Sequence, residues 1–171
     1  VEREAWIELV GYAPQDGGLF PHLTGAENLA IVAKSLHWTT EKIEQRILEL
    51  SPLLNLQQTW LARYPHELSG GQRQRISVGR ALFMNPKSLI LDEPLGALDP
   101  MLRSELQGEL KHLFARLKKT VIIVTHDLAE AAFLSETVTI IHKGQVAQTG
   151  TFSELFEAPA TPFVRQFLHA Q

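Results

Sequence analysis

The chain has 171 residues, of which 44% are hydrophobic and 20% charged, and its formal net charge is −3. This composition indicates a folded domain with a buried core, and the acidic balance argues against nucleic-acid binding, which normally needs a basic patch. The sequence has no cysteine, which excludes disulfides and thiolate metal sites, and no run of about 18 apolar residues that could span a membrane.

The first third of the chain predicts one strand followed by helices. Residues 7–12 alternate weakly before a proline, which favours a strand running into a loop at Gln15. The Thr-Gly-Ala-Glu sequence at residues 24–27 has the spacing of a capping box. Apolar residues recur at helical spacing over residues 41–50. The block 21–65 is therefore expected to form a helical subdomain between strand-like segments.

The rest of the chain alternates between predicted helices and strands. A helix is expected to begin at residues 69–72 and to stop at Asn85-Pro86, and Asp99 is expected to cap a helix that starts with Pro100. Expected elements are buried strands at 89–91 and 121–124, a helix capped by Asp127, a hairpin of 137–141 with 145–149, and a last helix at 163–168. This alternation predicts an α/β fold with a parallel sheet.

Two adjacent glycines, Gly70 and Gly71, stand at a predicted helix start. Without Cβ atoms, the backbone N–H groups there are open to an anion at the positive end of the helix dipole. The alternative is an ordinary helix start, because Ser69 and Gln72 have the spacing of a capping box.

Two carboxylates, Asp92 and Glu93, end the predicted strand at 89–91. Ligands of open α/β sheets bind at the carboxyl ends of strands, where an Asp can hold Mg²⁺ and a Glu can activate water. His126 follows the next strand and suits a hydrogen bond to a phosphate, and Gln15 follows the first strand. The alternatives are solvated loop carboxylates and a structural histidine.

Three arginines, Arg73, Arg75 and Arg80, lie on the predicted helix that follows the glycine pair. No aromatic residues are interleaved with them, so the helix does not have the pattern of a nucleic-acid-binding element. A solvated or ion-paired face is expected instead.

These segments, in this order, resemble the ATP-binding-cassette (ABC) ATPases, and the match covers nearly the whole chain. Gln15 matches the Q-loop of the family, residues 68–72 its signature motif, residues 89–93 its Walker B strand, residues 96–99 its D-loop and His126 its switch histidine.

The resemblance implies an ATP hydrolase that uses ATP and Mg²⁺. It implies catalytic roles for Glu93 and His126, metal binding by Asp92 and Gln15, and contacts to nucleotide by Gln15, Ser69, Gly70, Gly71, Gln72 and Asp99. In this family the signature motif of one subunit closes on ATP held by the other subunit.

The resemblance also implies a domain organisation and partners. Residues 1–20 and 66–171 are expected to form a P-loop NTPase-like core that is incomplete on its N-terminal side, with residues 21–65 as the helical subdomain. The expected partners are a second identical ATPase subunit and transmembrane permease subunits that contact the helical subdomain, with no nucleic acid. The protein would then lie as a peripheral subunit on the cytoplasmic face of the inner membrane.

Smaller segments narrow the expected function. Residues 64–67 look like the importer type, and residues 17–22 and 162–167 are similar to quaternary-amine importers. The expected function is energy coupling in an importer of glycine betaine, choline or a similar osmoprotectant. The alternatives are an ATPase of an amino-acid or other polar-solute importer, or a soluble ABC protein outside transport.

One motif of the family is missing: the chain contains no G-x-x-x-x-G-K-[ST] phosphate loop. This loop supplies most of the grip on ATP. We therefore expect the chain to be a piece of a longer protein, to lack ATP hydrolysis when isolated, and to associate in vitro through an open sheet edge.

Overall fold

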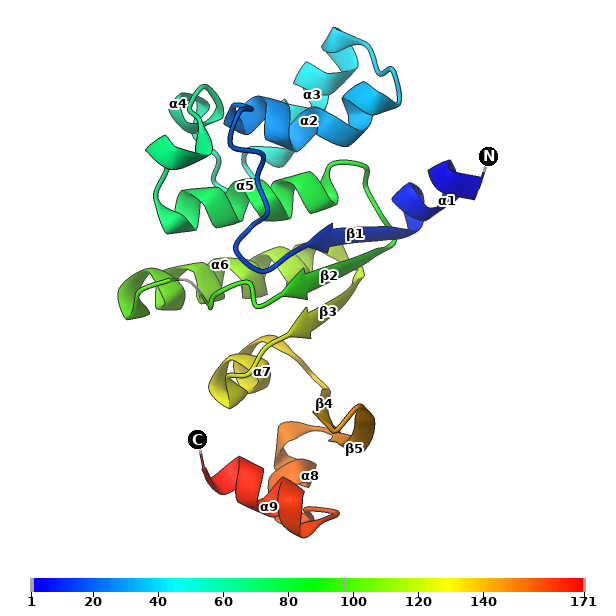
Figure 1. Cartoon of the computed structure of the whole chain (residues 1–171), viewed down its shortest axis with the longest axis vertical. Coiled ribbons are helices and arrows are strands. Elements are labelled where there is room, and N and C mark those ends of the chain that lie inside the picture. Colours follow the sequence, from blue (N-terminus) through cyan, green and yellow to red (C-terminus); the bar gives the residue numbers. More distant parts are fainter. Residues whose placement is uncertain (1, 97, 171) are drawn as a thin grey trace. The chain divides into compact units, whose positions relative to one another are not determined.

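The computed structural model describes residues 2–96 and 98–170. The chain forms two compact units, Val1–Val124 and Thr125–Gln171 (Figure 1). Both combine helices with a small sheet, in agreement with the predicted α/β class. Among the described residues, no helix has the length and apolar character that a membrane span requires.

The first unit contains a parallel sheet and a block of helices. Its elements are α1 (Glu2–Leu9), β1 (Val10–Ala13), α2 (Gly25–Ser35), α3 (Thr40–Leu50), α4 (Gln58–Leu61), the 3₁₀ helix η1 (Pro65–Glu67), α5 (Gly70–Leu82), β2 (Ser88–Asp92), α6 (Pro100–Leu117) and β3 (Thr120–Val124). The prediction of a strand over residues 7–12 was wrong in its first part, because residues up to Leu9 are helical. That segment is rich in Glu, Arg, Ala and Leu, which are strong helix formers.

The three strands pair in parallel in the order β1-β2-β3. On the face toward α5, which packs against β1 and β2, Leu89 and Leu91 of the central strand are fully buried. Strand β1 approaches α5 so closely that a Cβ on Gly11 would lie 2.1 Å from the carbonyl oxygen of Ala81. The alternation of buried and exposed residues therefore fixes which side chains face the helices.

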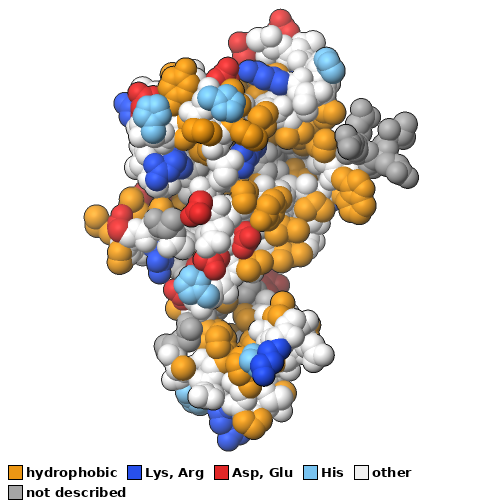
Figure 2. Space-filling view, in the orientation of Figure 1, with side chains coloured by type: hydrophobic (Ala, Val, Ile, Leu, Met, Phe, Trp, Pro, Cys, Tyr) orange, Lys and Arg blue, Asp and Glu red, His pale blue; other side chains and the backbone are white. Residues whose placement is uncertain are grey.

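The opposite face of this sheet remains exposed. Tyr12 is 51% exposed, and on β3 Ile122 and Val124 are 51% and 50% exposed. Figure 2 shows hydrophobic side chains gathered over the strands. The prediction of a buried strand at 121–124 was therefore wrong: exposed residues alternate along β3 with partly buried ones, and none is fully buried. An apolar run does not reveal how many faces of a sheet are covered. The association expected through an open edge of this sheet stays a prediction.

The helical block is fixed to its preceding loop by a capping box and a buried amide. The Thr24 hydroxyl accepts from the Glu27 amide, and the Glu27 carboxylate accepts from the Thr24 amide. Next to them, fully buried Asn28 accepts from the Phe20 amide at 2.7 Å and donates to the carbonyls of Phe20, Leu23 and Thr24. These bonds anchor residues 20–24 on α2. The subdomain boundary at 21–65 stays a prediction.

The second unit is built around an antiparallel hairpin. It contains α7 (Leu128–Leu134), β4 (Val138–His142), β5 (Gln145–Gly150), α8 (Phe152–Glu157) and α9 (Pro162–His169). Its core consists of Leu128, Ile140, Leu155, Val164 and Leu168. The predicted hairpin is confirmed, and its turn residues Lys143 and Gly144 have φ values of 49° and 76°.

We predict that Asn28→Ala lowers the free energy of unfolding by about 2–3 kcal/mol, because it leaves buried backbone groups without their partner. Urea unfolding followed by circular dichroism measures the effect. The exposed α3 residue Gln45 offers a control, and Gln45→Ala should change stability by less than about 0.5 kcal/mol. Equal effects of the two substitutions would contradict the anchoring role of Asn28.

Candidate functional site

The parallel register brings the ends of the strands to one edge of the sheet. Ala13 of β1 pairs with Leu91, and Asp92 of β2 pairs with Val124. The Glu93 amide donates to the Val124 carbonyl at 2.8 Å, which extends the pairing one residue beyond the strand. The segments that leave β1 and β2 therefore begin at the edge where ligands of open α/β sheets bind.

At this edge Gln15 and Glu93 are in direct contact, since Gln15 Nε2 donates to Glu93 Oε2 at 3.1 Å. Glu93 has a φ of +44°, in the left-handed region that costs a non-glycine residue about 1–2 kcal/mol. A Cβ on Gly96 would lie 3.0 Å from Glu93 Oε2, so this glycine leaves room for the carboxylate. A backbone strain of this kind at a predicted catalytic residue is typical of functional positions.

Asp92 has a partner that the motifs do not include. The hydroxyl of Tyr12 donates to Asp92 Oδ2 at 3.0 Å, and this hydrogen bond is the main cause that raises the pKa of Tyr12. The signal in the sequence is parity, because Tyr12 and Asp92 both occupy outward positions of neighbouring strands. Tyr12 thereby orients a predicted metal ligand.

The donor set at this edge fits Mg²⁺. Asp92 offers a carboxylate, and Gln15, whose Nε2 donates to Glu93, offers its amide oxygen. Mg²⁺ prefers oxygen ligands and usually takes one or two from the protein, with waters and phosphates completing the octahedron. Among the described residues, no group of three or more His, Cys, Asp or Glu is arranged to hold a metal by itself.

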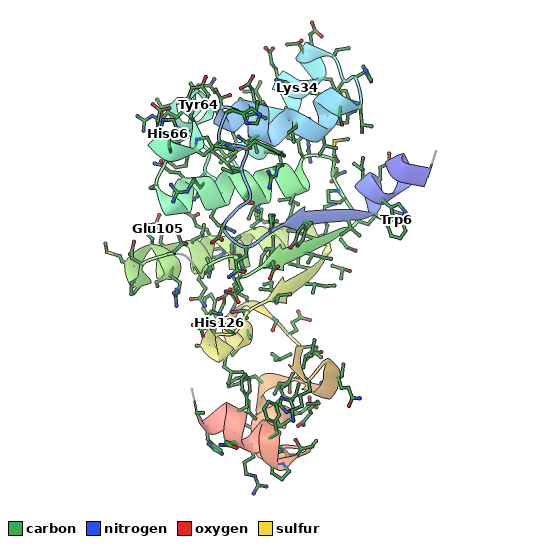
Figure 3. All side chains as sticks on the ribbon, viewed as in Figure 1. Trp6, Lys34, Tyr64, His66, Glu105 and His126 are labelled. Atoms are coloured by element: carbon green, nitrogen blue, oxygen red, sulfur yellow. The ribbon has the colours of Figure 1, made fainter. Side chains whose placement is uncertain are left out.

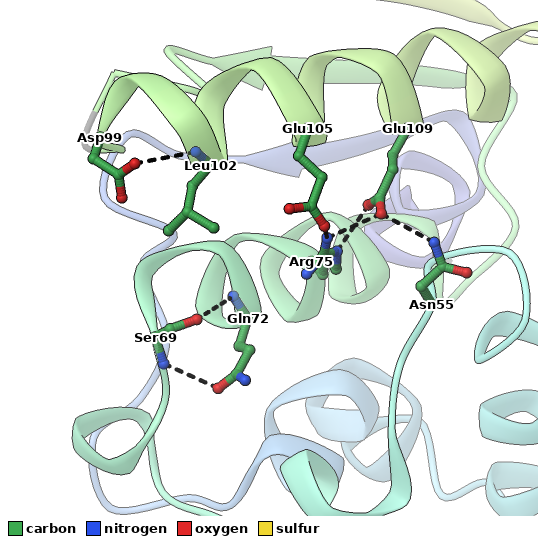
Figure 4. Close-up of polar contacts among 8 residues, drawn as sticks. All are labelled: Asn55, Ser69, Gln72, Arg75, Asp99, Leu102, Glu105 and Glu109. Carbon is green, nitrogen blue, oxygen red and sulfur yellow. Dashed lines mark hydrogen bonds and ion pairs between the residues drawn. The ribbon is translucent and has the colours of Figure 1, made fainter.

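The tip of α5 contains the predicted anion-binding glycines. Ser69 and Gln72 form a capping box (Figure 4). A Cβ on Gly70 would lie 2.9 Å from Cδ2 at the end of the Leu98 side chain, so packing within the chain favours a glycine here without requiring it. For Gly71 the nearest atom is 4.0 Å away, on Arg75. Packing among the described residues therefore does not require a glycine at position 71. The predicted anion-binding role of Gly71 stays a prediction.

The start of α6 lies beside this tip. Asp99 caps α6 by accepting from the amides of Met101 and Leu102, both at 3.1 Å, as predicted (Figure 4). Ala97, within the segment matched to the D-loop, lies outside the described residues. The nucleotide contact expected of Asp99 stays a prediction.

The three arginines of α5 have different partners. Arg75, with 11% of its side chain exposed, joins α5 to α6 through Glu105 at 3.2 Å and Glu109 at 2.8 Å (Figure 4), which confirms an ion-paired residue there. Arg73 and Arg80 instead donate to backbone carbonyls, so the expected solvated face is wrong for them. The carbonyl partners of Arg80, Gly17 and Gly18, are distant in sequence and leave no mark in the local pattern, whereas Arg73 binds the carbonyl of nearby Leu68.

His126 belongs to the second unit and is exposed there (Figure 3). The next residue, Asp127, caps α7 by accepting from the Glu130 amide at 3.0 Å, as the sequence predicted. Within the first unit the structure brings together Gln15, Asp92 and Glu93. The role expected of His126 stays a prediction.

Comparison with known proteins agrees with this arrangement. The family model described as "ABC transporter" matches residues 2–96, more than half of the chain. This chain belongs to the ABC transporter family. The dimeric structure of a post-hydrolysis ATP-binding cassette bound to ADP and Pi matches with a TM-score of 0.74 and 30% sequence identity, over 87% of this chain and 65% of that one.

Curated relatives in the ABC family have different transport names. The chain is 46% identical to a glycine betaine/carnitine/choline transport ATP-binding protein of Bacillus subtilis, over 93% of this chain and 42% of the relative. It is also 46% identical to a glycine betaine uptake system ATP-binding protein of Escherichia coli, over 92% of this chain and 51% of the relative. A sulfate/thiosulfate import ATP-binding protein of Thermosynechococcus vestitus is 42% identical, over 93% and 47%. The chain thus spans about half the length of these relatives or less.

We predict that Gly71→Ala leaves the free energy of unfolding unchanged or raises it by up to about 1 kcal/mol, because the space for a Cβ is present and alanine favours the helix. Chemical denaturation of the purified variant checks this. Gly11→Ala is the matched control, and its Cβ would collide with the carbonyl of Ala81, so it should be strongly destabilised. A loss of stability in Gly71→Ala comparable to that of the control would show that packing, and not a ligand, selects this glycine.

Proposed function

We propose that this chain is part of an ATP-hydrolysing subunit that supplies energy to an importer of quaternary-amine osmoprotectants. The single observation that carries the proposal is the contact of Gln15 with Glu93 beside Asp92, at the carboxyl edge of a parallel sheet in an ABC family chain. Two relatives at 46% identity bear glycine betaine in their names, which supports the class of solute.

The residues have complementary roles in this proposal. Glu93 orients and deprotonates the attacking water, and the hydrogen bond from Gln15 fixes the direction of its carboxylate. Asp92, oriented by Tyr12, holds Mg²⁺ together with Gln15. When bound, this ion neutralises charge on the phosphates. His126 donates to the terminal phosphate.

A second subunit completes the proposed site. Ser69, Gly70 and Gly71 meet the nucleotide held by the other subunit of a homodimer, with Gln72 and Asp99 holding the two helix starts in shape. Bare amides at the tip of a 13-residue helix suit an anion. ABC cassettes form dimers, as the solved dimeric relative does.

The permease subunits and the location of the protein follow from the same role. We place the permease contact on the block of residues 21–65 and the protein on the cytoplasmic face of the inner membrane, as a peripheral subunit without nucleic-acid partners. At the C-terminal end of this block Tyr64, 41% exposed, stacks on His66 (Figure 3), and at its N-terminal end Phe20, 43% exposed, meets His22 edge to face. Exposed aromatic groups of this kind are common in protein interfaces.

A second candidate is an importer of another polar solute. The sulfate/thiosulfate relative at 42% identity favours it, because its identity is only slightly lower than that of the osmoprotectant relatives. The two candidates share the ATPase site and differ in the membrane partner.

A segment exchange tests the proposal. The aligned segment of the Bacillus subtilis relative is replaced by this chain, and the purified chimera is assayed for Mg²⁺-dependent ATP hydrolysis and, in cells, for glycine betaine uptake. We expect both activities, and we expect Glu93→Gln to reduce hydrolysis by about 10²-fold or more while the chimera stays folded. The isolated 171-residue chain is the matched negative control, because it lacks a phosphate-loop motif.

The outcomes separate the parts of the proposal. A folded chimera without hydrolysis, or full hydrolysis in Glu93→Gln, would contradict the ATPase role. Hydrolysis without glycine betaine uptake would contradict the osmoprotectant class and favour the second candidate. Hydrolysis by the isolated chain would contradict the need for a phosphate loop.

A further inference from the structure

The loop that follows Gln15 has an unusual backbone. Asp16, Gly17 and Gly18 have φ values of 64°, 74° and 52°, so three consecutive residues are left-handed. Glycine tolerates this conformation, whereas Asp16 is strained by it. The Gly17 amide donates to the Pro14 carbonyl at 3.0 Å, which closes a turn around Gln15. A loop of this shape persists only when its surroundings hold it.

Helix α5 holds this loop with two side chains. Arg80 donates from Nη2 to the Gly17 carbonyl at 2.9 Å and from Nη1 to the Gly18 carbonyl at 2.7 Å. The hydroxyl of Ser77, which is fully buried, donates to the same Gly17 carbonyl at 2.8 Å. Hydrogen bonds from a charged donor are stronger than neutral ones. The bond to Gly17 is partly buried and the bond to Gly18 is exposed, and partial burial of the guanidinium lowers the pKa of Arg80.

We propose that Arg80, assisted by Ser77, is a positioning residue that holds Gln15 against Glu93 through the backbone of the loop. The contacts run from Arg80 to the carbonyls of Gly17 and Gly18 and from Gln15 to Glu93. Gln15 lies two residues before Gly17, inside the turn closed by the bond from the Gly17 amide to the Pro14 carbonyl, and Arg80 holds the C-terminal side of this turn. The value of this arrangement for ATP hydrolysis rests on the proposed function.

The same helix begins with Gly70 and Gly71 and runs without a break for 13 residues to Leu82. The tip that faces the second subunit's nucleotide and the residue that sets Gln15 are therefore parts of one rigid element. A shift of α5 relative to the sheet would therefore also move the loop that Arg80 and Ser77 hold, and with it Gln15 relative to Glu93. In this way the contacts of Arg80 and Ser77 couple the position of Gln15 to that of Gly70 and Gly71.

Substitution of Arg46 provides a control that distinguishes a positioning role of Arg80 from a purely structural one. Arg46 also uses two guanidinium nitrogens on two consecutive carbonyls, donating to Leu82 at 3.0 Å and Phe83 at 2.9 Å, at the same C-terminal end of α5 that bears Arg80. Arg46→Ala therefore removes a similar bond pair from the same helix without touching the loop. Arg80→Lys is the conservative variant, because it keeps the positive charge. Its single ammonium group cannot reproduce the planar fork that binds two carbonyls.

The experiment uses ¹⁵N-labelled full 171-residue chain without nucleotide. We expect Arg80→Ala to shift the side-chain amide signals of Gln15, to abolish their response to Glu93→Gln, and to speed hydrogen exchange of the Gly17 amide by about tenfold or more. Arg80→Lys should fall between wild type and Arg80→Ala. Arg46→Ala should leave the Gln15 signals and the Gly17 exchange rate unchanged.

Unchanged Gln15 signals in both Arg80 variants would overturn the proposal, and so would equal changes in Arg46→Ala. If Arg80→Ala does not fold, the decision rests on Arg80→Lys. Because no step needs ATP, failure here leaves the proposed ATPase role intact. Conversely, an inactive chimera leaves the positioning of Gln15 by Arg80 unaffected.

Discussion

The central constraint in the first unit is the burial of Leu89 and Leu91 on the inner face of β2. Both are fully buried, and the residues between and after them, Ile90 and Asp92, face the other side. A slip of β2 by one residue would turn every side chain to the opposite face and put Asp92 into the core. Burying a full-sized aliphatic side chain is worth about 1.5–3 kcal/mol, so the two leucines enforce this register. The hydrophobic pattern therefore decides the direction in which the predicted metal ligand points.

From this register the rest of the site follows by short steps. Asp92 accepts a hydrogen bond from Tyr12 on the neighbouring strand β1, and Glu93 continues the pairing with β3 through its amide. The left-handed backbone of Glu93 then ends the strand and presents the carboxylate to Gln15. Two hydrogen bonds hold Glu93 in this strained conformation: its amide donates to the Val124 carbonyl of the sheet, and its carbonyl accepts from the Gly96 amide in the following turn. An ordinary strand end would not need this conformation.

Helix α5 connects the sheet edge with the remaining elements. Arg75 joins it to α6 through Glu109, and Arg80 joins it to the loop of Gln15. Gly11 lets β1 approach it at the Ala81 carbonyl. A single helix thus bears the signature glycines, supports the sheet and holds the loop that leaves it. Helix α5 therefore combines the packing contacts of the first unit with the glycines that are proposed to contact nucleotide.

Several features could be predicted from the sequence because their causes are local. Capping boxes at Thr24 and Ser69, the cap at Asp99 and the hairpin turn at Gly144 depend on neighbours a few residues away. The bond between Arg80 and Gly18 joins residues 62 positions apart, and that between Tyr12 and Asp92 joins residues 80 positions apart. The contact of Arg80 leaves no periodic signal, and Tyr12 and Asp92 share only the parity of their positions, which does not reveal that their strands pair. The exposure of β3 was missed for a related reason, because the cover of a sheet face is a tertiary property.

One measurement tests most directly whether the strand ends form a nucleotide site. Mn²⁺ replaces Mg²⁺ with ATP in the segment-exchange chimera, and paramagnetic relaxation of assigned amide signals is recorded by NMR. We expect strong broadening of the Gln15 side-chain amide and of the Glu93 backbone amide, with little effect on the α3 amides. If nucleotide binds while the signals of Gln15 and Glu93 stay sharp, the metal–nucleotide site lies elsewhere, and Gln15 and Glu93 are not part of it.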